Sequence, residues 1–265
     1  MNDTAASPSL FPTTPPTRVR QDRLFYAIAA AMLLVTVLVG FQQFFLHGRR
    51  FSPAGAVVRP LTPSLRALTI VHGIAMTSWI VLFLVQPLLV ARRRLSLHRT
   101  AGKVGAVLAV LIVILDWKLA IGSALIDPQR TAPWSFIEWQ FMTVTLGTLL
   151  MFAGFVTLGV LNRHRAHPHR SMMFLATLAI MPAATDRIPA LLATFDHTVW
   201  GAAFGPFFPG VAFGAGAIAI RRFLTGSFER YLVTGWLVFA AIAAGLLRLA
   251  PTPAWHRISS MLLGL

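Results

Sequence analysis

The stretch RALTIVHGIAMTSWIVLFLVQPLLVARRRLSLHRTAGKVGAVLAVLIVILDWKLAIGSAL, residues 66–125, contains two long apolar segments joined by a short basic turn. Each apolar segment is long enough to cross a hydrocarbon core about 30 Å thick, for which an α-helix needs about 20 residues. Backbone groups find no water in that core, so helices are the structure expected for such segments. The stretch therefore predicts a hairpin of two membrane-spanning helices.

The composition of the whole chain agrees with that hairpin. Of the 265 residues, 56% are hydrophobic and 12% are charged, whereas soluble domains are about 25% charged. We expect an all-α, polytopic membrane helix bundle that forms one domain over residues 24–265. Residues 1–23 are expected to be a disordered cytoplasmic tail. The seven predicted spans cover residues 24–46, 67–90, 101–125, 137–161, 170–193, 201–220 and 231–249.

The basic residues predict an orientation. Four segments that would share one side of the membrane contain 14 Lys and Arg residues, whereas the other side contains 8. The richer side is expected to be cytoplasmic, which places the N-terminus inside and the C-terminus outside. The formal net charge of +15 is thus explained by loops facing the lipid bilayer. No soluble domain is apparent that could present a nucleic-acid-binding face.

Three polar residues recur at seven-residue intervals in the second predicted span. His72, Trp79 and Gln86 are each two helical turns apart and so share one face. A polar stripe on a membrane helix is expected to face protein or a cavity rather than lipid. It indicates either hydrogen bonding between helices or a face that binds a ligand.

Charged residues lie near the outer ends of the third and fifth predicted spans. Asp116 and Arg187 are expected at equal depth, with Lys118 and Asp186 close to the same level. Ionisable groups within a membrane are usually paired or line a cavity. We therefore predict a polar cluster in the outer third of the membrane, formed by these four residues and His72. The alternative is a set of structural ion pairs whose side chains extend to the interface.

Histidine–arginine pairs open the third and fifth predicted spans, at His98-Arg99 and His169-Arg170. Two imidazoles at one depth on neighbouring helices can supply both axial ligands of a b-type haem. Alternatively, each pair anchors its helix at lipid phosphates, with Arg99 and Arg170 as interface residues. The chain has no cysteine, which excludes disulfides, thiolate metal sites and covalent c-type haem.

No metal site is predicted. His164, His167 and His169 alternate along one short loop, but the neighbouring Arg163, Arg165 and Arg170 would repel a cation. The chain also contains no phosphate-binding loop, no dinucleotide-binding glycine pattern and no nucleophile elbow. Its motifs therefore do not indicate an enzyme.

Several motifs together resemble a widespread family of uncharacterised bacterial multi-pass membrane proteins, over residues 24 to about 262. These motifs are Gly40-Phe41, His72-Gly73, Trp79, Gln86, Arg94, His98-Arg99, Gly102, His169-Arg170-x-Met172-Met173, Arg187 and Thr252-Pro253-Ala254-Trp255. The resemblance implies seven spans and a bacterial inner-membrane location. A looser likeness to transmembrane b-type cytochromes concerns the histidines alone. Glu229 departs from the family pattern, which has a histidine in that turn.

Three functions remain open from the sequence. The outer polar cluster favours binding or translocation of a small molecule, lipid or proton. His98 and His169 favour a haem-b membrane electron-transfer protein. The third interpretation is an assembly or structural subunit that requires a membrane partner subunit.

Overall fold

The computed structural model describes residues 16–42, 46, 62–129, 132, 134 and 136–265, which are mostly helical and contain no β-strand. The predicted tail falls outside this part of the chain except at residues 16–23, which belong to the first helix. The elements are α1 (Pro16–Gly40), α3 (Pro63–Ala91), α4 (Leu95–Ala124), α5 (Glu138–Leu161), α6 (Ala166–Ala179), α7 (Pro182–Thr185), α8 (Pro189–Leu192), α9 (Val199–Phe204), the 3₁₀ helix η3 (Gly205–Phe207), α10 (Phe208–Thr225), α11 (Arg230–Leu249) and α12 (Pro253–Leu263).

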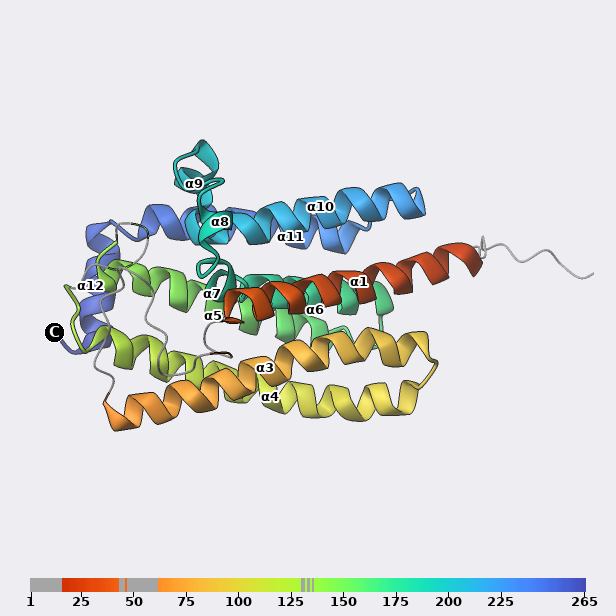
Figure 1. The fold of residues 1–265 in the computed structure, drawn as a ribbon, viewed down its shortest axis with the longest axis horizontal. Helices are drawn as coiled ribbons and strands as arrows, with labels where there is room; N and C mark the ends of the chain where they lie inside the picture. Colours follow the sequence, from red (N-terminus) through yellow and green to blue (C-terminus); the bar gives the residue numbers. More distant parts are fainter. Residues whose placement is uncertain (1–15, 43–45, 47–61, 130–131, 133, 135) are drawn as a thin grey trace, which may run out of the picture.

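The long helices form three layers (Figure 1). The α3–α4 hairpin lies on one side, α10 and α11 lie on the other, and α1, α5 and α6 lie between them. At the end where the chain terminates, α12 crosses the ends of α4 and α5. The short helices α8 and α9 project from the side of the bundle.

Helix α6 is the buried centre of the bundle. Its Phe174, Leu175 and Leu178 have no measurable exposure to solvent, and Phe152 of α5 and Phe239 of α11 are equally buried in the same core. A helix that is apolar on all sides is stable only when other helices enclose it. The motif His169-Arg170 lies near the start of α6. The close packing of this helix therefore fixes the position of the motif.

Five helical segments are long and apolar enough to cross a membrane, at residues 63–91, 95–124, 138–161, 199–225 and 230–249. They coincide with five of the seven predicted spans. The predicted span at 170–193 is broken, as expected from its two prolines: α6 ends at Ala179, and Pro182 and Pro189 each begin a short helix. Proline lacks a backbone N–H and is tolerated best in the first turn of a helix. The apolar part of α1 covers Leu24–Gly40; the predicted span extends to residue 46, and its residues 43–45 lie outside the described part of the chain.

The outer surface of the bundle is apolar. On α4, Val104, Val107 and Val110 expose 62%, 72% and 61% of their surface, and their three-residue spacing places them along one side of the helix. A large exposed apolar face is unfavourable in water but is what lipid requires. These surfaces and the five long helices support a membrane protein.

The basic turns gather at one end of the bundle, which we call the basic end. It comprises the start of α1 and the turns that join α3 to α4, α5 to α6 and α10 to α11 (Figure 1). The four segments that the sequence assigned to one side of the membrane thus lie at one end of the bundle. Arg49, Arg50, Arg59 and Arg130, which were counted on the other side, lie outside the described residues.

Candidate functional site: a cavity and an imidazole pair

The polar stripe of α3 is divided between neighbouring helices. His72 Nε2 lies 4.0 Å from Asp116 Oδ1 on α4, whereas Trp79 Nε1 donates a hydrogen bond to Thr177 Oγ1 on α6 at 3.3 Å. Trp79 is 2% exposed, so its indole is held within the bundle. His72 and Trp79 thus connect α3 to α4 and to α6, as polar residues in membrane proteins commonly do.

The charged residues predicted as one outer cluster are not joined into a single group. Asp116 contacts His72 on its hairpin partner α3. Arg187 donates instead to the carbonyl oxygen of Ala183 on its own segment. Lys118 is exposed on α4. Equal depth along parallel helices does not fix the direction in which a side chain points, which depends on the rotation of each helix.

A cavity of about 900 Å³ is lined by Trp134 and Phe136, by residues of α9 and of the connection that precedes it, and by the last turn of α11. Asp186, the fourth member of the predicted cluster, lines it and is half-buried. Three exposed ionisable residues share the lining: Asp196, His197 and Arg248. The volume falls within the range of about 300–1,000 Å³ that small-molecule sites occupy.

An aromatic wall supports Asp186. The indole Nε1 of Trp134 donates a hydrogen bond to Asp186 Oδ2 at 3.4 Å, and the Trp134 ring stacks on Phe195 at 5.6 Å between centroids. Trp134 has φ of 63°, a left-handed conformation that is rare for a bulky residue. Backbone strain of this kind costs about 1–3 kcal/mol and concentrates at ligand-binding sites.

Asp186 retains one unsatisfied oxygen. Its Oδ1 atom is buried and has no hydrogen-bond partner, although buried polar atoms are normally paired. The residue follows α7 and lies outside the five long spanning segments. Burial raises the pKa of the Asp186 carboxyl to about 7, against the opposing effects of the Trp134 hydrogen bond and the Arg187 charge.

Sequence reasoning identified Asp186 but not the other residues around this cavity. Trp134, Asp196 and His197 lie in short connections without hydrophobic periodicity, and Arg248 appeared only in the count of loop charges. The sequence offered one indication of such a site, namely that aromatic and acidic residues in loops between spans often bind ligands. Their positions in the sequence do not show which loops lie next to one another in the fold.

The basic end contains a buried ion-pair network that the sequence did not reveal. Asp22 Oδ2 lies 2.5 Å from Arg170 Nη2, and Asp22 Oδ1 accepts from Arg221 Nε at 3.0 Å. The Arg170 guanidinium also lies 5.1 Å from the Tyr26 ring centroid and 2.8 Å from His167 Nδ1. Burial and the Arg170 charge lower the pKa of His167. Arg170, predicted as an interface anchor like the exposed Arg99, thus joins α6 to α1.

Glu229 belongs to the same end. It is 7% exposed, caps α11 by accepting from the backbone N–H groups of Tyr231 and Leu232, and accepts a hydrogen bond from Ser171. A carboxylate at a helix N-terminus satisfies free N–H groups and interacts favourably with the helix dipole. Glu229 therefore has a structural role at the start of α11.

His98 and His169 meet at the basic end. Their ring centroids are 6.3 Å apart and their planes are nearly perpendicular, at 89°. His169 Nδ1 lies 2.8 Å from the carbonyl oxygen of Gly159, and the Gln86 amide contacts His98 Nδ1. The third residue of the α3 stripe is thus directed to this pair.

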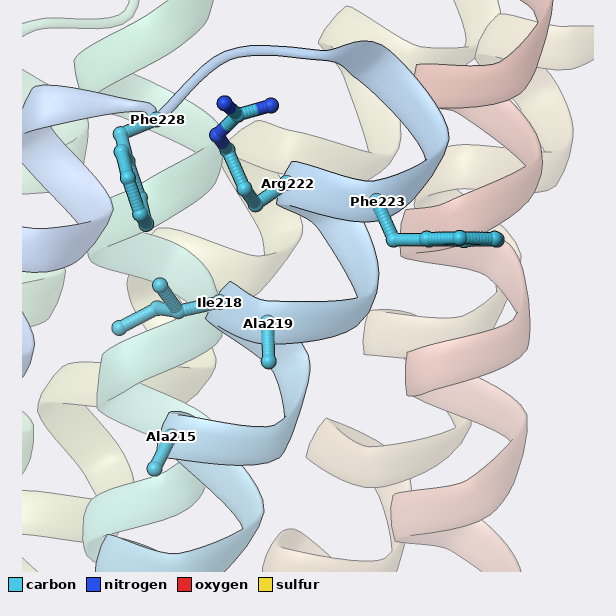
Figure 2. Close-up of a pocket in the computed structure, with 6 residues that line it drawn as sticks. All are labelled: Ala215, Ile218, Ala219, Arg222, Phe223 and Phe228. Carbon is cyan, nitrogen blue, oxygen red and sulfur yellow. The ribbon is translucent and has the colours of Figure 1, made fainter.

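A smaller, shallow cavity of about 520 Å³ lies on the outside of α10 (Figure 2). The Arg222 guanidinium lies 5.4 Å from the Phe228 ring centroid at its end. Phe223 points to the other side of α10 and is 88% exposed. This hollow presents hydrocarbon and one cation, as expected of a surface in contact with lipid.

Comparison with known proteins found no match among family models, curated proteins or solved structures.

Proposed function

We propose that this chain is a seven-span protein of the bacterial inner membrane that binds a small organic cation in the cavity at Asp186. In this proposal α1 and the pair α6–α7 supply the two spans beyond the five long ones. The basic end faces the cytoplasm because that side carries the excess of Lys and Arg. The last turn of α11, which lines the cavity, then lies toward the outside.

The unpaired Oδ1 atom of Asp186 carries this proposal. A buried carboxylate oxygen can only accept a hydrogen bond when it is ionised, so its natural partner is a donor with positive charge. The Trp134 indole beside it adds a ring face that attracts cations. Two carboxylates line the cavity, Asp186 and Asp196, against one guanidinium, that of Arg248.

Thermal unfolding of the detergent-purified protein tests the proposal with butylammonium as the probe. Butylammonium should stabilise the protein, by about 2.7 kcal/mol when its concentration is 100 times Kd. Sodium butyrate at the same ionic strength should not, because it presents a carboxylate to Asp186. The variant Asp186→Asn should lose the response.

Asp127→Asn is the matched control, because Asp127 is exposed and lies outside the cavity. It should keep the full response to butylammonium. Equal stabilisation by butyrate, or an unchanged response in Asp186→Asn, would contradict binding of a cation at this residue.

A further inference from the structure

Two arginines meet one tyrosine at the basic end of the bundle. Arg165 Nη2 donates a hydrogen bond to the hydroxyl oxygen of Tyr231 at 2.9 Å, and Arg230 Nη2 donates to the same oxygen at 2.7 Å. Arg165 lies in the turn that joins α5 to α6, whereas Arg230 and Tyr231 begin α11. We call these three residues the arginine clamp. We propose that the arginine clamp binds the phosphate group of an anionic phospholipid in the leaflet at the basic end.

The charges of the arginine clamp call for an anion. Neither of its guanidinium groups forms an ion pair with a described residue, whereas Arg170 and Arg221 at the same end both contact Asp22. Both arginines of the clamp are also exposed, so a ligand can reach them. Two positive charges held close together repel each other. An anion bound between them offsets that repulsion.

The separation of the two guanidinium groups fits one phosphate group. Because both Nη2 atoms bond to the same hydroxyl oxygen, they are at most 5.6 Å apart, which is the total of the two hydrogen-bond lengths. Charge-assisted N–H···O hydrogen bonds are about 2.7–2.9 Å long, so one phosphate oxygen can accept from both arginines. Toward the described residues, each guanidinium uses only Nη2 in a hydrogen bond. Its other N–H groups can therefore bind the remaining phosphate oxygens.

Tyr231 both orders the two arginines and adds a third donor. Its ring centroid lies 5.8 Å from Arg165 Cζ and 4.7 Å from Arg230 Cζ, so the half-buried ring holds both guanidinium groups by cation–π contacts. A site ordered before binding loses less entropy when the ligand arrives. The Tyr231 oxygen accepts from both arginines, and no acceptor for its own hydrogen lies among the described residues. That hydroxyl can therefore donate to the phosphate.

The acidic residue beside the arginine clamp is occupied elsewhere. Glu229 precedes Arg230, is 7% exposed, and accepts hydrogen bonds from the backbone N–H groups of Tyr231 and Leu232 and from the Ser171 hydroxyl. These donors stabilise its negative charge within the bundle. The same hydrogen bonds occupy N–H groups in the first turn of α11. The phosphate would therefore be bound by the side chains of the clamp and not by the helix N-terminus.

The exposed side of α11 favours a phospholipid over a soluble phosphate. Thr234, Leu237 and Ala241 follow Arg230 by about one, two and three helical turns, so they lie on the same side of the helix. All three are exposed, and Leu237 exposes 54% of its surface. The Thr234 hydroxyl donates to the carbonyl oxygen of Arg230, which leaves a largely apolar strip. The acyl chains of a lipid held at the clamp would lie along this strip.

The test is native mass spectrometry of the full chain in detergent, titrated with dioleoylphosphatidylglycerol. Dioleoylphosphatidylcholine has the same acyl chains, but its choline cation would face the two arginines, so its Kd should be about tenfold higher. Inorganic phosphate at the concentration of the lipid should not displace dioleoylphosphatidylglycerol, because it makes no contact with the apolar strip. Equal affinities for the two lipids would overturn the proposal. Displacement by inorganic phosphate would also overturn it, since the clamp would then be a site for soluble phosphate.

Variants separate the arginine clamp from the general charge of the basic end. Arg165→Gln and Arg230→Gln should each raise the Kd for dioleoylphosphatidylglycerol at least about tenfold, because each removes charge-assisted hydrogen bonds to the phosphate. Tyr231→Phe keeps the ring and should raise it about 2–10-fold.

Arg163→Gln is the matched control, because it removes the same charge from the same turn, where Arg163 Nη1 donates to the carbonyl oxygen of Val160. It should change the Kd less than about twofold. Both arginines of the clamp are exposed, so their variants should keep the melting temperature of the parent in detergent alone. Equal losses of lipid binding in Arg163→Gln and Arg165→Gln would overturn the proposal. Asp186→Asn should bind the lipid like the parent, so this test is independent of the cavity.

Discussion

Arg170 Nη2 lies 2.5 Å from Asp22 Oδ2, and this ion pair fastens the start of α1 to the start of the central helix α6. Arg221 of α10 contacts the same carboxylate and is 4% exposed. One acidic side chain therefore contacts two basic ones where three helices meet. The pair holds α6 in place beside His169, the residue that precedes Arg170.

Asp22→Asn should lower the free energy of unfolding by about 3–5 kcal/mol. The substitution removes the charge that compensates Arg221, and an uncompensated buried charge is strongly destabilising. Chemical denaturation in mild detergent measures the change. The control Asp127→Asn affects an exposed carboxylate and should leave stability within about 0.5 kcal/mol of the parent. Equal midpoints for the two variants would mean that the Asp22 network is not buried.

Gly201→Ala should destabilise the wall of the cavity. A Cβ at this position would collide with the carbonyl oxygens of Phe195 and Asp196, which belong to the backbone and cannot rotate away. We expect a loss of at least about 1–3 kcal/mol and a weaker response to butylammonium. Gly216→Ala is the matched control, because a Cβ there meets nothing within 4 Å, and alanine favours a helix by about 1 kcal/mol over glycine. If both variants have the same melting temperature, the close packing of Gly201 against the backbone of Phe195 and Asp196 does not contribute to stability.

Butylammonium binding should weaken as the pH falls from 8 to 6. Burial places the pKa of Asp186 near 7, so the ionised fraction that attracts the cation falls about tenfold over this range. The ammonium group stays charged, since alkylamines titrate near pH 10. Titration calorimetry at pH 6, 7 and 8 measures Kd.

Other charges around the cavity decide how this pH dependence is interpreted. His197 also lines the cavity, and a positive charge on its imidazole would repel a cation. His197→Gln should therefore retain most of the pH dependence. If it removes the dependence, His197 rather than Asp186 is the group that titrates.

A double-mutant cycle should show coupling between His72 and Asp116. Their closest atoms are 4.0 Å apart, and contacting polar pairs couple by about 0.5–3 kcal/mol. The pair Asp116 and Arg187 should show no such coupling, because Arg187 bonds to its own segment. Unfolding of the alanine variants measures both terms. If exchanging Asp116 and Arg187 recovers stability, these two side chains form the ion pair expected from the sequence, and the prediction is wrong.

The sequence alone determined the class of fold, the hairpin at 66–125 and the end of the bundle at which the basic turns gather. These follow from long apolar runs and from counts of charged residues, which are properties of segments. The sequence also indicated the break after α6, because Pro182 and Pro189 interrupt the predicted span at 170–193.

The tertiary structure decided which side chains meet. Depth along a helix can be read from sequence, and it correctly indicated that His98 and His169 lie at one level. Rotation about the helix axis depends on packing with distant segments, so Asp116 faces His72 rather than Arg187. The contacts of Asp22 with Arg170 and of Trp134 with Asp186 join residues far apart in the chain. No local period encodes such contacts, because they form only when the helices pack around α6.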